Sequence, residues 1–102
     1  MSVARLADAG DGGVRVDGVL GFDTVTRLLA ESDARFRPGR PLRIDLAGVT
    51  SANSAGIALL LEWMELARER RVDLAYTNLP ESMQRIAAIS NLTALLPVQD
   101  PQ

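Results

Sequence analysis

The chain has 102 residues, of which 47% are hydrophobic and 24% are charged, and its formal net charge is −2. This length fits one compact domain of globular composition. The sequence contains no cysteine or histidine, which excludes a disulfide framework, a thiol nucleophile and a histidine-based metal site. The arginines are scattered along an acidic chain, which argues against nucleic-acid binding through a basic face.

No apolar signal-peptide core is found in residues 1–13, and the longest apolar run, residues 55–61, is far too short to cross a bilayer. We therefore expect a soluble cytoplasmic protein that does not insert directly into a membrane. A single domain is expected over residues 1–102, with a flexible tail at 97–102.

Two short strands are predicted first, at residues 3–7 and 14–16, joined by a glycine-rich turn. A helix follows over about residues 23–36, because apolar residues recur there at helical spacing. Pro38 and Pro41 end this helix, since proline cannot continue it.

The second half alternates strands with helices. Strands are predicted at residues 42–49 and 72–77, helices at 54–70 and 78–90, and a short apolar segment at 91–97. The order β-β-α-β-α-β-α predicts an α/β fold with a mixed, mostly parallel sheet of four to five strands.

Small residues, "TSANSAG", join the strand at 42–49 to the helix at 54–70. Partners of α/β proteins tend to meet loops at the carboxyl ends of strands. Asn53 or Ser54 can accept a hydrogen bond from the first helical turn, worth about 1 kcal/mol, and Ala55 and Gly56 leave that turn without bulky side chains. Two interpretations stay open: an ordinary helix cap, or a surface on which another polypeptide docks.

Ser54 is also a candidate phosphorylation site. A phosphate there would be accommodated by the unpaired N–H groups and partial positive charge of a helix N-terminus. It would nevertheless add about −1.5 to −2 charges to the surface. Such a change leaves the fold intact and disturbs docking, as a switch requires.

The helix at 54–70 is apolar over a wider arc than the roughly 100° that a surface helix needs. One stripe should face the sheet, and a second stripe lies beside it. The second stripe is covered either by another helix of the same domain or by a partner, and an exposed Trp63 would favour the partner. The first stripe contains Ile57, Leu60, Leu61, Met64 and Ala67, and the second contains Leu59, Trp63 and Leu66.

Catalysis is the least supported class of function. All 11 basic residues are arginines, so no lysine base is present. Asp45 and Asp23 could lie near the small-residue junction, but nothing in the sequence couples them. Asp45 is expected to brace loop N–H groups from the end of its strand. No catalytic residue, metal ligand or cofactor is predicted.

The predicted order, with "IDLAGVTSANSAGIALLL" at its centre, resembles the STAS domain, the fold of bacterial anti-sigma factor antagonists. In that family a strand leads to an Asp-Ser/Thr-small-Gly junction whose serine or threonine is phosphorylated. The resemblance places Ser54 at that position, followed by Ala55 and Gly56. Asn53 stands where the family usually has aspartate, and Gly21 where it often has an acidic residue.

Within the family the chain is most similar to MlaB-like proteins, the small STAS subunits of the Mla ABC transporter, which moves phospholipid between the membranes of Gram-negative bacteria. The similarity lies in "SAGIALLLEW", "ELARERR", "NLPESMQRIAAISNL" and the terminal "LLP". It implies a non-catalytic adaptor or regulatory subunit that binds the ATPase subunit and acts in phospholipid trafficking and outer-membrane lipid asymmetry. Such a subunit is cytoplasmic and peripheral to the inner membrane through its complex.

The alternative function is that of an anti-sigma factor antagonist, which binds an anti-sigma factor kinase and is switched by phosphorylation of Ser54. Both functions use the same junction. The residues expected to bind the partner are Ser51, Asn53, Ser54, Ala55, Gly56, Ala58 and Leu59.

Overall fold

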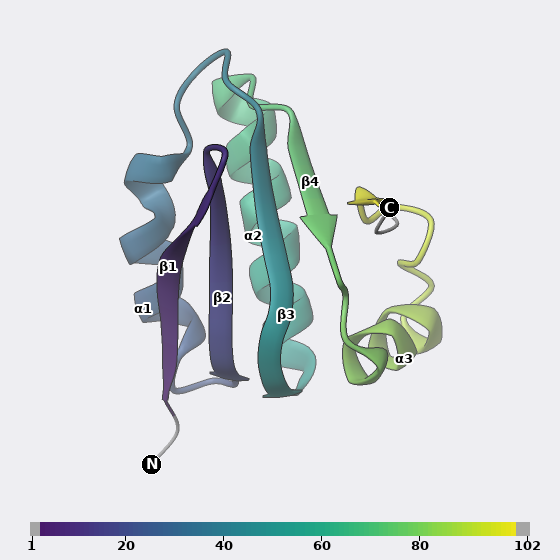
Figure 1. The fold of residues 1–102 in the computed structure, drawn as a ribbon. Coiled ribbons are helices and arrows are strands. Elements are labelled where there is room, and N and C mark those ends of the chain that lie inside the picture. Colours follow the sequence, from purple (N-terminus) through teal and green to yellow (C-terminus); the bar gives the residue numbers. More distant parts are fainter. Residues whose placement is uncertain (1–2, 100–102) are drawn as a thin grey trace.

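The computed structural model describes residues 3–99, which form a five-stranded sheet in the order β1-β2-β3-β4-β5 together with three α-helices (Figure 1). β1 is antiparallel to β2, and the other neighbouring strands are parallel. The predicted α/β fold with a mixed, mostly parallel sheet is therefore confirmed. The strands are β1 (Ala4–Gly10), β2 (Gly13–Leu20), β3 (Leu42–Ala52), β4 (Leu74–Thr77) and β5 (Val98–Gln99).

The helices are α1 (Val25–Ser32), α2 (Ser54–Arg70) and α3 (Glu81–Ile89), and a short 3₁₀ turn, η1 (Asp33–Arg35), follows α1. In Figure 1, α1 and α2 lie behind the sheet, and α3 lies to the right of β4. The bounds predicted for α2 agree with the structure. α1 is shorter than predicted because its last turn tightens into η1.

The first three strands are longer than predicted, and Gly18 shows why for β2. The φ of Gly18 is +102°, a backbone conformation that glycine adopts far more readily than other residues. A Cβ on Gly18 would lie 2.1 Å from the carbonyl oxygen of Val3, so the glycine also permits close approach of β1. β2 therefore continues through Gly18 to Leu20, with a shift in its register against β3 between Gly18 and Val19.

The tail predicted over 97–102 needs correction in its first part. The backbone N–H of Tyr76 donates to the carbonyl of Pro97 at 2.9 Å, and Val98 and Gln99 pair with β4 as β5. The buried side chain of Leu96 anchors the chain beside that strand. Residues 100–102 lie outside the described residues.

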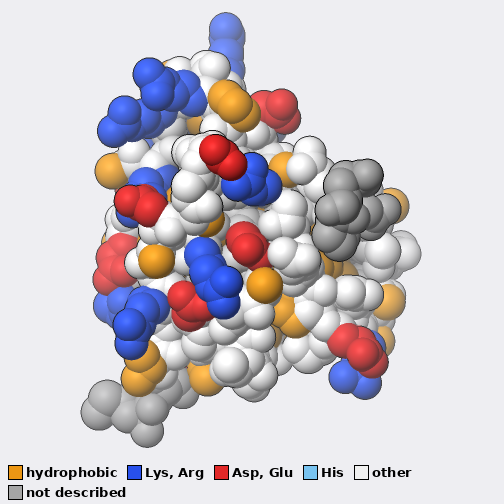
Figure 2. All heavy atoms as spheres, in the orientation of Figure 1, with side chains coloured by type: hydrophobic (Ala, Val, Ile, Leu, Met, Phe, Trp, Pro, Cys, Tyr) orange, Lys and Arg blue, Asp and Glu red, His pale blue; other side chains and the backbone are white. Residues whose placement is uncertain are grey.

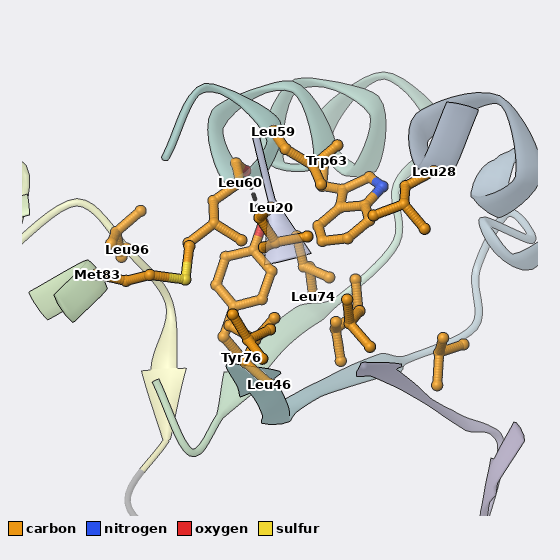
Figure 3. Packing of buried hydrophobic residues seen from close by; sticks show 14 of the residues in the cluster. Leu20, Leu28, Leu46, Leu59, Leu60, Trp63, Leu74, Tyr76, Met83 and Leu96 are labelled. Carbon is orange, nitrogen blue, oxygen red and sulfur yellow. Dashed lines mark hydrogen bonds between the residues drawn. The ribbon is translucent and has the colours of Figure 1, made fainter. Parts of the chain in front are cut away.

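The hydrophobic core lies between the sheet and the helices (Figure 3). Trp63 and Tyr76 are fully buried at its centre, and the phenol of Tyr76 donates to the carbonyl of Leu60 at 2.6 Å. The indole N–H of Trp63 donates to the hydroxyl of Ser32 in α1 at 2.7 Å. The second apolar stripe of α2 is thus covered at Trp63 by a helix of the same chain, which decides between the two alternatives.

The opposite face of the sheet carries charged side chains of both signs, which are interspersed in Figure 2. Across neighbouring strands, Arg5 lies opposite Asp17 and Arg15 lies opposite Asp45. Arg15 also forms an ion pair with Asp17 at 2.7 Å. This face therefore stays in contact with water.

Asp45 braces its surroundings as expected, although from within β3. Its carboxylate accepts hydrogen bonds from the Ala47 backbone and the Asn78 amide, both at 2.9 Å. Burial raises the pKa of Asp45, but these hydrogen bonds and the charge of nearby Arg15 outweigh burial, so the pKa lies below its ordinary value. Because β3 extends to Ala52, Asp45 lies roughly 23 Å along the strand from the junction and takes no part in it.

Candidate protein-interaction site

The junction between β3 and α2 is a one-residue turn held by Asn53. Its backbone N–H donates to the carbonyl of Leu20 at 3.1 Å, which ties the end of β3 to the end of β2. Its side-chain oxygen accepts from the backbone N–H of Ala55 at 2.8 Å. Asn53 is therefore the N-cap of α2, which stabilises the helix by about 1 kcal/mol. The capping interpretation is confirmed, and it leaves the question of docking open.

Gly56 lets the first turn of α2 pack tightly against the sheet and α3. A Cβ there would lie 3.1 Å from Leu20 Cβ, 3.2 Å from Ala52 Cβ and 3.4 Å from Met83 Cε. The small residue is thus needed on the inner side of the helix. Gly56 and its neighbour Ala55 are both buried.

The structure divides the residues expected to bind a partner into two groups. Ser51, Asn53, Ser54 and Ala58 are exposed, whereas Ala55, Gly56 and Leu59 are buried. The expectation that these last three residues contact a partner through their side chains needs correction, because all three are buried. Leu59 is only 2% exposed and packs in the core beside Trp63 (Figure 3), because α1 covers this side of α2.

Ser54 and Ala58 lie one turn apart on the same exposed side of α2. Ser54 occupies the first helical position, where backbone N–H groups lack partners within the helix. The first turn contains no acidic residue, so the partial positive charge of this helix end is not offset by a side chain of that turn. The surface combines small side chains with a favourable setting for negative charge.

A neighbouring loop, residues 21–24 between β2 and α1, was not assigned to the site from sequence. A Cβ on Gly21 would lie 3.3 Å from the carboxylate of Asp23 and 3.6 Å from the side-chain nitrogen of Asn53. Asp23 therefore lies near the junction, unlike Asp45. Phe22, at the tip of this loop, is 77% exposed. Thr24 is the sequence signal that could have identified this turn, because threonine hydroxyls often form hydrogen bonds with the backbone of turns.

Within residues 3–99, no group of three acidic side chains gathers in a way that could hold a metal ion. None of the helices in this part of the chain is long and apolar enough to span a membrane.

The family model described as Mlab, STAS domain, matches residues 4–97, and the chain therefore belongs to the STAS domain family. The resemblance seen in the sequence is confirmed. The fold is also similar to solved structures of anti-sigma factor antagonists. The unphosphorylated form of SpoIIAA has 14% identity and a TM-score of 0.72, with 98% of this chain and 89% of that chain covered. An anti-sigma factor antagonist from Mycobacterium paratuberculosis has 22% identity and a TM-score of 0.70, with 100% and 87% covered.

At these identities the solved structures show likeness of fold alone. No curated protein matches the chain.

Proposed function

We propose that this protein is a non-catalytic adaptor that binds the ATPase subunit of an Mla-type ABC transporter and acts in phospholipid trafficking and outer-membrane lipid asymmetry. The complex would hold it at the cytoplasmic side of the inner membrane. The match to the Mlab family model supports this choice of partner.

The exposed start of α2 is the observation that carries the proposal. Ser54 and Ala58 present small side chains, and Asn53 holds the turn in one conformation. A partner backbone can approach such a surface closely, and little conformational freedom is lost on binding because the turn is already ordered. The site thus suits recognition of another protein.

An anti-sigma factor antagonist is the second candidate function. It is favoured by solved structures of that class that resemble the fold, the two described above among them, and by the position of Ser54 at a helix N-terminus without acidic residues in its first turn. A phosphate on Ser54 would be stabilised by this helix end and would add charge where the partner docks.

Co-purification with the ATPase subunit tests the adaptor function. Ser54→Arg should abolish the complex, because a long charged side chain occupies the point of close approach. Ala34→Arg is the matched control. Ala34 is also exposed, in η1 at the other end of α2, where Arg70 donates to the carbonyl of Asp33 at 2.9 Å. Retention of the complex by Ser54→Arg, or its absence with the wild type, counts against the proposal.

Two purified partners separate the two functions. The wild-type protein is mixed with the ATPase subunit and, separately, with the anti-sigma factor kinase and ATP. The adaptor function predicts a stable complex with the ATPase only. Kinase binding together with a single phosphate on Ser54, detected by mass spectrometry, supports the antagonist instead.

A further inference from the structure

We propose that Phe22 is the apolar anchor of this docking surface, and that its ring enters an apolar pocket on the ATPase subunit when the complex forms. The inference rests on the proposed function and assigns it a residue outside the STAS junction.

Phe22 differs from the other aromatic residues of the chain in its exposure. Its side chain is 77% exposed, whereas the other three aromatic residues are at most 1% exposed. The core therefore contains every aromatic ring except this one. The other three are Phe36, Trp63 and Tyr76.

The loop that carries Phe22 is held in place by Thr24. The buried hydroxyl of Thr24 accepts a hydrogen bond from the N–H of Gly21 at 3.0 Å and donates one to the carbonyl of Val19 at 2.8 Å. The bonds close a tight turn on both sides of Phe22. An exposed aromatic side chain on an ordered backbone loses little freedom when it is buried by a partner.

This turn lies directly beside the start of α2. Leu20 pairs with Ala52 at the ends of β2 and β3, and Gly21 approaches the side chain of Asn53. Phe22 follows Gly21, so its Cα lies about 3.8 Å from that of Gly21. The loop that carries Phe22 is therefore adjacent to the junction that carries Ser54, and one partner surface can cover both.

The chemistry of the surroundings favours a protein as the occupant. A buried phenylalanine removes about 150–250 Å² from water, and aromatic anchors surrounded by weak contacts dominate many interfaces. Around Phe22, the small residues of the junction supply such contacts. An anionic lipid surface is disfavoured because Asp23, the next residue, is exposed and acidic.

Binding of the full chain to the purified ATPase subunit, measured by calorimetry, tests the role of Phe22. Phe22→Ala should raise the Kd at least about 30-fold, the effect of losing a dominant anchor, and Phe22→Leu should recover part of the affinity. Leu95→Ala, which removes a side chain that is 62% exposed in the segment before β5, is the control and should leave the Kd unchanged. The Tm of each variant should match that of the wild type.

The outcomes distinguish the inference from the function on which it rests. If Phe22→Ala binds within about threefold of the wild type while Ser54→Arg does not bind, the adaptor function stands and the inference is overturned. An equal loss of affinity with Leu95→Ala also overturns it. So does a result in which Phe22→Ala abolishes self-association of the protein and leaves binding to the ATPase unchanged. If the wild type does not bind the ATPase, both fail.

Fluorine NMR gives a direct measurement of burial. The chain has only 2 phenylalanines, so incorporation of 4-fluorophenylalanine yields one resonance from exposed Phe22 and one from buried Phe36. Addition of the unlabelled ATPase should shift the Phe22 resonance and protect it from a soluble paramagnetic agent, while Phe36 stays unchanged. Continued access of the agent to Phe22 in the complex overturns the inference.

Discussion

The indole N–H of Trp63 donates to the hydroxyl of Ser32 at 2.7 Å, and both side chains are buried between α1 and α2. The Ser32 hydroxyl in turn donates to the carbonyl of Leu29 at 2.8 Å. This pair joins the two helices that cover one face of the sheet. It also satisfies the one polar group of a large ring in an apolar core.

Ser32→Ala should lower the free energy of unfolding by about 1–3 kcal/mol, because it leaves the buried N–H of Trp63 without an acceptor. Urea denaturation followed by circular dichroism measures the change. The control is Ser90→Ala at the exposed end of α3, which should cost no more than about 0.5 kcal/mol. Equal stability of Ser32→Ala and the wild type would show that the hydrogen bond is not needed.

Gly56→Val should destabilise the fold by about 1–3 kcal/mol through overpacking against Leu20 and Ala52. Ala58→Val places the same side chain on the exposed side of α2, and its cost should be limited to the small difference in helix propensity. Thermal unfolding of the two variants gives the comparison. Similar Tm values for both would contradict the tight packing of the first turn.

Ser54→Asp should fold at least as stably as the wild type, with a gain of about 0.3–1 kcal/mol at low salt, because negative charge is favourable at a helix N-terminus. Ser90→Asp, at the C-terminal end of α3, should instead lose stability, since that end carries partial negative charge. Both changes should shrink as salt is added. A marked fall in the Tm of Ser54→Asp would mean that a phosphate on Ser54 also disrupts the fold.

Asp45 should make folding pH-dependent in acid. Its pKa in the folded protein is lower than the ordinary value of 3.8, so its stabilising contribution is present above that value and is lost as the pH falls through the folded pKa. Urea titrations of the wild type and Asp45→Asn at several pH values measure this effect. The stability advantage of the wild type should shrink below about pH 4, and an advantage that stays constant in acid would contradict the assignment.

The periodicity of the sequence was sufficient to predict α2 and the order of the main elements. Helical spacing of apolar residues is a local signal, and the small polar residues at the junction marked where the helix begins. The same signal left Asn53 and Ser54 as alternative N-caps, and the structure shows that the N-cap is Asn53.

The assignment of Leu59 to the partner surface was wrong, because an apolar arc on a helix does not say what covers it. The cover is supplied by α1, whose Ser32 is distant from Trp63 in sequence. Phe22 was missed for a related reason. Its exposure results from the hydrogen bonds of Thr24 and the position of α1, neither of which a local pattern specifies.

The uncovered face of the sheet bears on how the protein behaves in a crowded cell. Arg5 opposite Asp17 and Arg15 opposite Asp45 place opposite charges side by side across three strands. Two copies stacked face to face would have to strip water from these charges and would bring like charges together in many registers, so unwanted stacking of sheets gains little. The charged face of the sheet therefore disfavours self-association, and the surface at the start of α2 remains accessible to a partner.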